Sequence, residues 1–243
     1  INQSNFRFTP TDLRTIRYGL GAVKGTGEAA LSVVLSVRES AGPFRDIFDF
    51  CQRVDKRTVN KRTIEALVRA GAFDHCHPER AHVLATVELA MGAAEQVQQH
   101  ANQASLFDLL ATPAQDSGLV LQTQLPAWTE SERLQQEKMA LGLYLSGHPF
   151  DPYRVELRQI AKTSLERLQA GKELQWAAGV VMSVRSKMTA RGRMMFVHID
   201  DGSAQREVAV YHELSERCRA MLREDQLLVL AVKVSPDDYS GGL

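Results

Sequence analysis

A short glycine-containing turn beside a lysine is the part of this sequence best suited to bind an anion. Lys24-Gly25-Thr26-Gly27 leads directly into an apolar-patterned segment that starts at Glu28. Glycine has no Cβ and adopts positive φ without steric cost, so such a turn exposes backbone N–H groups. When the turn also begins a helix, those groups and the positive end of the helix dipole point to one place in solvent. The Lys24 ammonium adds a full positive charge, which favours a phosphate or another anion.

The order of the residues decides between phosphate-binding motifs. A nucleotide P-loop requires Gly-Lys followed by Ser or Thr, whereas here the lysine precedes Gly25 and Thr26. A dinucleotide fingerprint that starts at Gly19 needs glycine at position 24, which is lysine. An apolar residue, Gly-x-Gly and an alanine-rich helix are typical of helix-hairpin-helix modules, which grip a DNA backbone phosphate without reading base sequence. The alternative is structural: glycines that end one helix and begin the next.

A second basic turn lies further along the same region. Apolar spacing predicts helices over 28–39, 46–54 and 61–70, with Asn60 as an N-cap and Gly71 just after the third helix. The turn before the third helix and the first residues of that helix carry the cations Lys56, Arg57, Lys61 and Arg62. Two helix-turn-helix units in tandem favour duplex DNA, whose phosphates supply sequence-independent, salt-sensitive affinity.

The net charge of zero conceals a gradient along the chain. Residues 1–80 carry 13 Lys and Arg against 9 Asp and Glu, residues 81–175 carry 7 against 11, and residues 176–243 carry 9 against 9. The positive excess therefore coincides with the two basic turns. A charge run is often only a solvated surface, so the gradient supports the DNA interpretation without carrying it alone.

A short peptide in the polar middle region indicates contact with a protein partner. The helix that starts near residue 77 loses that character over 95–102, and residues 111–118 have the composition of a linker. Between them, an adjacent Leu-Phe pair exposes apolar surface unless a partner or its own domain covers it. Gln-x-Ser-Leu-Phe is the pattern with which bacterial replication proteins hold the sliding clamp. We therefore expect clamp contacts from Gln103, Ser105, Leu106 and Phe107.

The last region changes from helical to strand patterning. Strands are expected over 176–184, 194–199, 207–211 and 227–234, with a helix over 212–222. Three strands, a helix and a further strand is the order of an OB-fold, which lays single-stranded nucleic acid across strands 2 and 3 and the adjoining loops. A basic loop over 185–193 fits that use, and the expected single-strand contacts are Arg185, Lys187, Arg191, Arg193 and Phe196. The alternative is a small barrel used only for packing. No fifth strand is visible, so the barrel is expected to be incomplete.

No group of residues in the sequence indicates catalysis or metal binding. Asp200 and Asp201 precede Gly202 at the end of an expected strand, where turn formation explains them better than paired metal ligation does. His148 precedes Pro149, which is also typical of a turn. We predict no catalytic residue, no metal ligand and no cofactor in this segment.

Composition places the chain among ordinary soluble proteins of about two domains. Of its 243 residues, 44% are hydrophobic and 24% are charged. There is no apolar run of about 18 residues that could span a membrane, and no secretory signal. The three cysteines are widely spaced, which suits a reducing cytosol. A cytoplasmic location without membrane partners is expected, and a first residue other than Met predicts a piece of a longer chain.

Four motifs along the chain resemble the alpha subunits of bacterial DNA polymerase III, the replicative C-family polymerases. They are the segments Tyr18 to Gly27, Ala70 to Asp74, Leu141 to Pro149, and the strand series from Ala177. The resemblance implies a multidomain α+β chain, in which a helical tandem helix-hairpin-helix domain precedes a truncated OB-fold β-barrel. It implies the end of a fingers region at 1–18, the helix-hairpin-helix domain at 19–110 with the clamp peptide at 103–107, a linker and helical connector at 111–172, and the OB domain at 173–243.

The resemblance also implies a function. The parent is a magnesium-dependent, template-directed nucleotidyltransferase whose catalytic carboxylates belong to a palm domain, and nothing in this segment matches that palm. The segment itself is expected to hold duplex and single-stranded DNA and the beta sliding clamp. Through the parent chain, the clamp loader subunit tau and the proofreading subunit epsilon are expected partners.

Two alternatives remain at this point. One is an error-prone C-family paralogue, which is expected to lack an intact Gln-x-Ser-Leu-Phe peptide. The other is a non-enzymatic accessory protein that combines the same DNA-binding modules.

Overall fold

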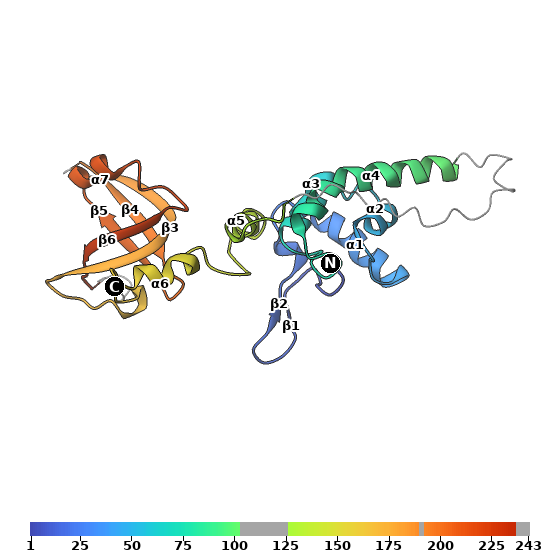
Figure 1. Ribbon diagram of the computed structural model, residues 1–243. Helices are drawn as coiled ribbons and strands as arrows, with labels where there is room; N and C mark the ends of the chain where they lie inside the picture. The colour runs from blue at the N-terminus through green and yellow to red at the C-terminus, as the bar shows by residue number, and fades with distance from the viewer. Residues whose placement is uncertain (103–125, 190–191, 237–243) are drawn as a thin grey trace. The chain divides into compact units, whose positions relative to one another are not determined.

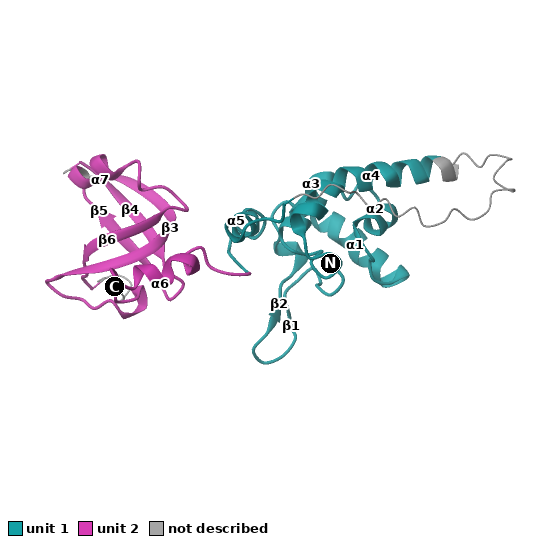
Figure 2. Cartoon of the chain, in the orientation of Figure 1, with its two compact units in different colours: residues 1–145 teal, residues 146–243 magenta. Residues whose placement is uncertain are grey.

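The chain folds into two compact units, residues 1–145 and residues 146–243 (Figure 2). The computed structural model describes residues 1–102, 126–189 and 192–236. Unit 1 is mainly helical and unit 2 is built on an antiparallel sheet (Figure 1). This order of a helical part followed by a curled antiparallel sheet agrees with the expected fold class, a helical domain followed by a truncated OB-like barrel.

Unit 1 begins with a two-stranded hairpin and continues as a series of helices (Figure 1). The elements are β1 (Thr9–Pro10), β2 (Ile16–Arg17), the 3-10 turn η1 (Leu20–Ala22), α1 (Glu28–Ala41), α2 (Ile47–Arg53), α3 (Lys61–Arg69), α4 (Arg80–Asn102) and α5 (Glu130–Leu141). The three helices expected over residues 28–70 are all present, with ends within about two residues of the expected ones.

Local capping explains where these helices begin. The Asn60 carboxamide accepts a hydrogen bond from the backbone N–H of Thr63 at 3.0 Å, which confirms Asn60 as the N-cap of α3. Asp46 caps α2 in the same way through the N–H of Asp49 at 2.8 Å. The aromatic ring of Phe50 is fully buried between Phe44 and Phe73, with ring centroids 4.9 Å and 5.1 Å away. The caps set the helix starts, and this aromatic cluster holds α2 in the core.

The helix α4 extends further than its sequence pattern indicates. Residues 95–102 were expected to lose helical character, but α4 continues through Asn102. The expectation is wrong because Glu, Gln and Ala are strong helix formers even without an apolar stripe. The Glu95 carboxylate also pairs with Lys56 at 2.9 Å, which ties this polar part of α4 to the turn before α3.

A buried carboxylate connects two of the segments that carried the resemblance. Glu137 of α5 is fully buried, accepts from Arg80 at 2.9 Å and accepts from the backbone N–H of Leu145 at 2.9 Å. Arg80 also pairs with Asp74 at 2.6 Å. Gly71 has φ +78°, and a Cβ there would run into the Arg80 guanidinium. The glycine is therefore required for the approach of Arg80, which in turn holds Asp74 and the end of α5 together.

Unit 2 is a four-stranded antiparallel sheet with the strand order β5-β4-β3-β6. Its elements are η3 (Asp151–Tyr153), α6 (Arg154–Leu157), η4 (Leu165–Arg167), β3 (Leu174–Thr189), β4 (Gly192–Asp200), β5 (Gln205–Val210), α7 (His212–Cys218) and β6 (Leu227–Lys233). The strands curl together (Figure 1), and β5 and β6 form the two edges of the sheet as described. A cavity of about 520 Å³ is lined by residues of both edge strands, so the barrel is open between them.

The strand β3 is longer than expected, and so is β4. Residues 185–193 were expected to form a loop, but Arg185 and Lys187 lie in β3 and Arg193 lies in β4. The loop assignment is wrong because pairing between the two strands continues to Thr189 and Gly192. Polar strand residues are stabilised here by cross-strand pairing, a long-range property that composition does not reveal.

The two faces of the sheet have different surroundings. Val181, Val197 and Ile199 point into the buried core on the concave side, where Leu165 and Leu168 also pack. On the other face, Phe150 packs on Ala178 and Val180. Residues 146–172 therefore contribute to the cores of unit 2, whereas α5 packs with α3 in unit 1. Of the described residues 126–172, α5 thus belongs to unit 1 and residues 146–172 belong to unit 2.

The helix α7 is shorter than expected and ends at Cys218 rather than Leu222. Of the helices in the described residues, none is long and apolar enough to cross a membrane.

Candidate nucleic-acid interface

The first basic turn presents open backbone. Gly25 has φ +86°, and a Cβ placed on Gly25 or on Gly27 meets no atom within 4 Å. The Thr26 hydroxyl donates inward, toward the carbonyls of Val23 at 2.7 Å and Leu20 at 3.1 Å. The side chain of Thr26 thus fixes the turn, while the two glycines leave the outer side of the backbone accessible to a partner.

The same turn begins α1. Gly27 is the N-cap, and it has ordinary dihedral angles, φ −77° and ψ 151°, so only Gly25 requires glycine for its conformation. No side chain caps this end of α1. The first backbone N–H groups of a helix have no partner within the helix, and the helix dipole makes that end positive. The turn can therefore accept an anionic oxygen at the start of α1.

Lys24 has a structural role that its sequence position does not reveal. Its backbone N–H donates to the carbonyl of Ala140 at 2.7 Å, and a Cβ on Gly142 would lie 2.9 Å from the Lys24 ammonium nitrogen. Gly142 ends α5 with φ +81°. The ammonium therefore lies at the negative end of α5, where a cation is favourable, while the side chain is exposed to solvent.

A hydrogen bond brings the first basic turn next to the start of α3. The buried hydroxyl of Thr63, in the first turn of α3, lies 3.5 Å from the carbonyl oxygen of Gly25. Lys61 and Arg62 begin the same helix and are exposed. The first turn therefore lies next to the start of α3 in unit 1, where Lys61 and Arg62 are found. We call the residues expected to contact duplex DNA, 24–27, 56, 57, 61 and 62, the twin-turn surface; Lys56 and Arg57 belong to the turn that precedes α3.

Two cations of the twin-turn surface are paired with carboxylates of α4. Lys61 lies 2.8 Å from Glu88, and Lys56 lies 2.9 Å from Glu95. The hydrogen bond between Lys61 and Glu88 lowers the pKa of Glu88 and raises the pKa of Lys61. Arg57 and Arg62 are exposed. The local charge available to a phosphate is therefore smaller than a count of the cations suggests, and Arg57 and Arg62 contribute the larger part.

The sheet of unit 2 presents an aromatic ring beside a cation. Phe196 of β4 lies directly opposite Arg185 of β3, and Lys187 lies opposite Met194. Opposite residues share a face and successive residues alternate, so Phe196, Arg185 and Lys187 lie on one face. Arg193 pairs with Met188 and lies on the other face by the same alternation. Three of the expected single-strand residues thus come together and Arg193 does not, while Arg191 lies outside the described residues.

Two residues beside Phe196 were missed in the sequence. His198 lies two residues after Phe196 along β4, and Glu207 of β5 lies opposite His198. Both residues therefore share the face that carries Phe196. The Arg185 guanidinium lies 2.9 Å from Glu207 and 2.7 Å from the His198 ring nitrogen Nε2, which is itself 2.8 Å from Glu207. Alternation with the inward-facing Val197 and Val208 was the signal that could have placed them on this face.

Asp200 and Asp201 are turn residues, as expected. Asp201 is buried and accepts hydrogen bonds from the backbone N–H groups of Leu165, Ser203 and Ala204 at 2.8–3.2 Å. Burial raises the pKa of its carboxyl, but the hydrogen bonds from Ser203, Leu165 and Ala204 outweigh burial and hold the pKa below its ordinary value. Asp200 accepts from the Gly202 N–H at 2.7 Å. These carboxylates are occupied in holding the β4–β5 turn.

His148 lies against that turn. Its Nε2 is 3.3 Å from Asp200, and its Nδ1 accepts from the backbone N–H of Phe150 at 3.2 Å. In the described residues, no group of three or more His, Cys, Asp or Glu side chains could hold a metal ion. The expected clamp residues Gln103, Ser105, Leu106 and Phe107 lie outside the described part of the chain.

Comparison with known proteins bears on the helix-hairpin-helix prediction and on the resemblance to DNA polymerase III alpha subunits. A helix-hairpin-helix motif model matches residues 1–83. The chain is 47% identical over 242 residues to the DNA polymerase III subunit alpha of Neisseria meningitidis serogroup B, and 41% identical over 248 residues to that of Vibrio cholerae. It is 34% identical over 253 residues to that of Escherichia coli K12.

These matches cover the whole of this chain and 21% of each of these three relatives. The chain therefore spans about one fifth of the length of the curated relatives it matches. The resemblance carried by the four sequence motifs is confirmed: along its full length, this chain is homologous to a segment of the alpha subunit of bacterial DNA polymerase III.

Proposed function

We propose that this chain is the DNA-holding and clamp-binding portion of the alpha subunit of a bacterial replicative DNA polymerase III. The observation that carries the proposal is the contact between Thr63 and Gly25, which brings the first basic turn next to the start of α3 and its exposed cations Lys61 and Arg62. A single exposed glycine turn is a common structural feature. A basic turn at the start of α1, held beside the start of α3 with its exposed cations, is suited to contact two phosphates of one duplex.

Duplex DNA is held through its backbone in this proposal. A phosphate oxygen approaches the open side of Gly25 and Gly27 and is met by the N–H groups at the start of α1. Arg57 and Arg62 contact neighbouring phosphates, with smaller contributions from Lys56 and Lys61 because Glu95 and Glu88 already pair with them. Contacts of this kind give affinity without base specificity, which suits a protein that follows any template.

Single-stranded DNA is held on the sheet of unit 2. Phe196 offers a ring on which a base can stack, and Arg185 and Lys187 on the same face offer cations for the adjoining phosphates. Arg193, near the start of β4, remains a proposed contact, and Arg191 remains one on the sequence alone. Arg193 lies on the opposite face, so it can contact a strand only where that strand passes around the hairpin end.

The clamp-binding part of the proposal rests on the sequence alone. Gln103, Ser105, Leu106 and Phe107 match the Gln-x-Ser-Leu-Phe pattern for the beta sliding clamp. The intact peptide favours the replicative enzyme over an error-prone paralogue.

The activity of the whole parent is also a proposal. The relatives are DNA polymerase subunits, so we infer a parent that is a magnesium-dependent DNA-directed DNA polymerase in the cytoplasm, with its catalytic carboxylates and metal in a palm domain. The clamp loader subunit tau and the proofreading subunit epsilon are its proposed partners. In this proposal the role of the described residues of this segment is to bind DNA.

Duplex binding tests the proposal through one glycine. Gly27→Val adds a side chain where the structure has open space, so the fold tolerates it while a phosphate is excluded. Gly92→Val adds the same side chain in open space on α4 and serves as the control. Polarisation of a labelled random-sequence duplex over a salt series is expected to show weaker binding for Gly27→Val and a log–log salt slope shallower by about 0.9, the value for one lost phosphate contact. Equal binding by wild type and Gly27→Val contradicts the assignment of the first turn.

A further inference from the structure

Glu207 stands at the centre of the face proposed for single-stranded DNA. Its carboxylate lies 2.9 Å from the guanidinium of Arg185 and 2.8 Å from His198. The three side chains come from the neighbouring strands β5, β3 and β4 and share the face that carries Phe196. An acidic side chain that forms an ion pair with the cation next to the stacking ring weakens DNA binding unless the DNA can displace it.

We propose that the Glu207 carboxylate acts as an internal competitor of DNA: it occupies Arg185 in the free protein and is displaced by a phosphate of single-stranded DNA. The inference rests on the proposed single-strand function of this face. Carboxylate and phosphate are recognised by guanidinium with the same planar hydrogen-bonding geometry, so one can replace the other on Arg185.

The exposure of the pair makes this exchange feasible. The Arg185 side chain is 68% exposed and that of Glu207 is 41% exposed. Exposed ion pairs are weak because water screens the charges and the long side chains lose freedom when they pair. A phosphate can therefore displace Glu207 at small cost, and the released carboxylate can turn into solvent.

The position of Arg185 explains why the competition affects stacking as well as charge. Phe196 lies directly opposite Arg185 across the β3–β4 pair. A phosphate bound to Arg185 therefore holds the adjoining base near the Phe196 ring. While Glu207 occupies Arg185, this combined contact is unavailable. The result is a weaker and more readily exchanged grip, which suits a template strand that must keep moving.

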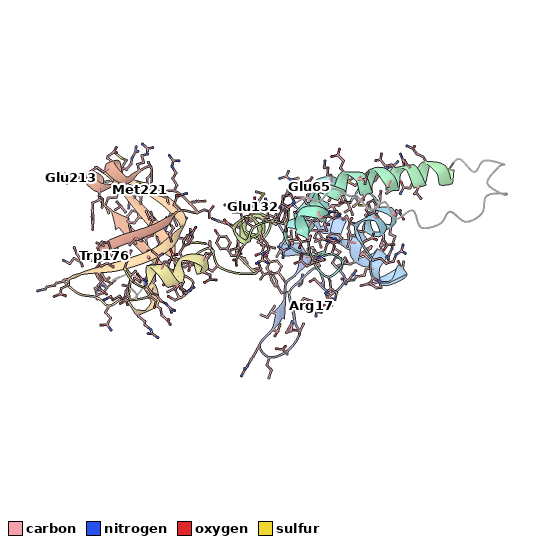
Figure 3. All side chains as sticks on the ribbon, viewed as in Figure 1. Arg17, Glu65, Glu132, Trp176, Glu213 and Met221 are labelled. Carbon is pink, nitrogen blue, oxygen red and sulfur yellow. The ribbon has the colours of Figure 1, made fainter. Side chains whose placement is uncertain are left out.

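Removal of the carboxylate charge tests the inference. Glu207→Gln keeps the shape and hydrogen-bonding capacity of the side chain and removes only its charge. Glu213→Gln removes the same charge from α7 and is the matched control; Glu213 is labelled in Figure 3. The full 243-residue chain is titrated into labelled oligothymidylate of about 16 nucleotides, the upper site size of one OB-fold. Thermal unfolding of each variant shows that the fold is retained.

The expected result is a gain of affinity confined to one variant. Glu207→Gln should bind roughly two- to fivefold more tightly than wild type, the range set by the energy of an exposed ion pair. Its log–log salt slope should stay close to that of wild type, because Arg185 meets the same phosphate in both complexes and only the cost of displacing Glu207 is removed. Glu213→Gln should bind like wild type. In an Arg185→Gln background the gain from Glu207→Gln should disappear, since there is no guanidinium to release.

The remaining outcomes separate two failures. If Phe196→Ala and Lys187→Gln weaken binding but Glu207→Gln binds like wild type, the competitor inference is overturned and the proposed face stands. An equal gain for Glu207→Gln and Glu213→Gln also overturns the inference, because it is then an effect of net charge. If Phe196→Ala and Lys187→Gln leave binding unchanged, the proposed face is wrong and the inference falls with it.

Discussion

The hydroxyl of Thr63 lies 3.5 Å from the carbonyl oxygen of Gly25 and 3.3 Å from the side-chain oxygen of Asn60, its own helix cap. The single hydroxyl proton is therefore shared between the cap of α3 and the first basic turn. This arrangement couples the position of Gly25 to the start of the helix that carries Lys61 and Arg62. The twin-turn surface depends on that coupling for its geometry.

Thr63→Val should weaken duplex binding and lower stability by about 1 kcal/mol, the cost of one lost hydrogen bond. The substitution keeps the shape of the side chain and removes only the hydroxyl. Duplex affinity by polarisation and unfolding in urea measure the two effects. Thr86→Val is the control, since the Thr86 side chain is also buried and its hydroxyl donates to the backbone carbonyl of His82 at 2.7 Å within α4. It should lower stability similarly but leave DNA binding unchanged, and an equal loss of binding in both variants would show that Thr63 has no special role.

Glu137→Ala should destabilise unit 1 by about 3–5 kcal/mol, the usual cost of removing one partner from a buried ion pair. The substitution leaves Arg80 buried beside an empty space and frees the backbone N–H of Leu145. Urea unfolding followed by circular dichroism measures the loss. Glu132→Ala, on the exposed side of the same helix α5, removes only a capping contact to Thr129 and should cost about 1 kcal/mol. The two glutamates are close in sequence (Glu132 is labelled in Figure 3), so similar losses would contradict the role of the buried network.

Much of unit 1 could be predicted from sequence because its signals are local. Asn60 precedes α3 and Gly71 follows it, and each acts on residues within one helical turn. The ion pair between Lys61 and Glu88 spans 27 residues, and its partner cannot be read from any local pattern. For that reason a count of Lys and Arg in the sequence overestimates the unpaired positive charge of the second turn and the start of α3.

The sheet of unit 2 shows the same limit. Phe196 was predicted as a contact from its type and its basic surroundings. Alternation along the strands could have placed His198 and Glu207 on the same face as Phe196, but that they lie next to Arg185 follows only from the register of β3, β4 and β5. The extension of β3 to Thr189 was missed because pairing with β4, rather than the propensity of the residues, makes those residues a strand. The contacts of Glu137 were likewise hidden, since Arg80 lies 57 residues away.

Arg62→Gln should weaken duplex binding more than Lys56→Gln does. Lys56 is already paired with Glu95, so part of its charge is neutralised before DNA binds. Arg62 is exposed, so its loss should remove a larger share of the positive charge that meets a phosphate. Arg62→Gln is expected to reduce the log–log salt slope by about 0.9, the loss of one phosphate contact. Salt titrations of both variants with one duplex make the comparison. A larger effect at Lys56 would mean that the ion pair with α4 does not persist on DNA.

Acid should destabilise unit 2 through Asp201. The folded-state pKa of Asp201 lies below its ordinary value, so the ionised carboxylate contributes stability above the unfolded pKa, about 3.9. That contribution falls as the pH drops below the unfolded value and is lost when the pH passes through the folded pKa. Thermal unfolding of unit 2 between neutral pH and about pH 3 should therefore show a falling midpoint. Asp201→Asn should start lower at neutral pH and lose less on acidification, whereas parallel curves for the two proteins would refute the assignment.

The replicase assignment is tested most directly by binding of the 243-residue chain to a bacterial beta sliding clamp, measured by calorimetry. Wild type is compared with the double variant Leu106→Ala, Phe107→Ala, which removes the apolar pair of the proposed clamp peptide and leaves the DNA-binding residues intact. We expect micromolar or tighter binding by wild type and its loss in the double variant. Failure of the folded wild-type chain to bind would contradict the assignment of residues 103–107 as the clamp contact and favour an error-prone paralogue or an accessory DNA-binding protein. Equal binding by both proteins would show that Leu106 and Phe107 do not carry the clamp contact.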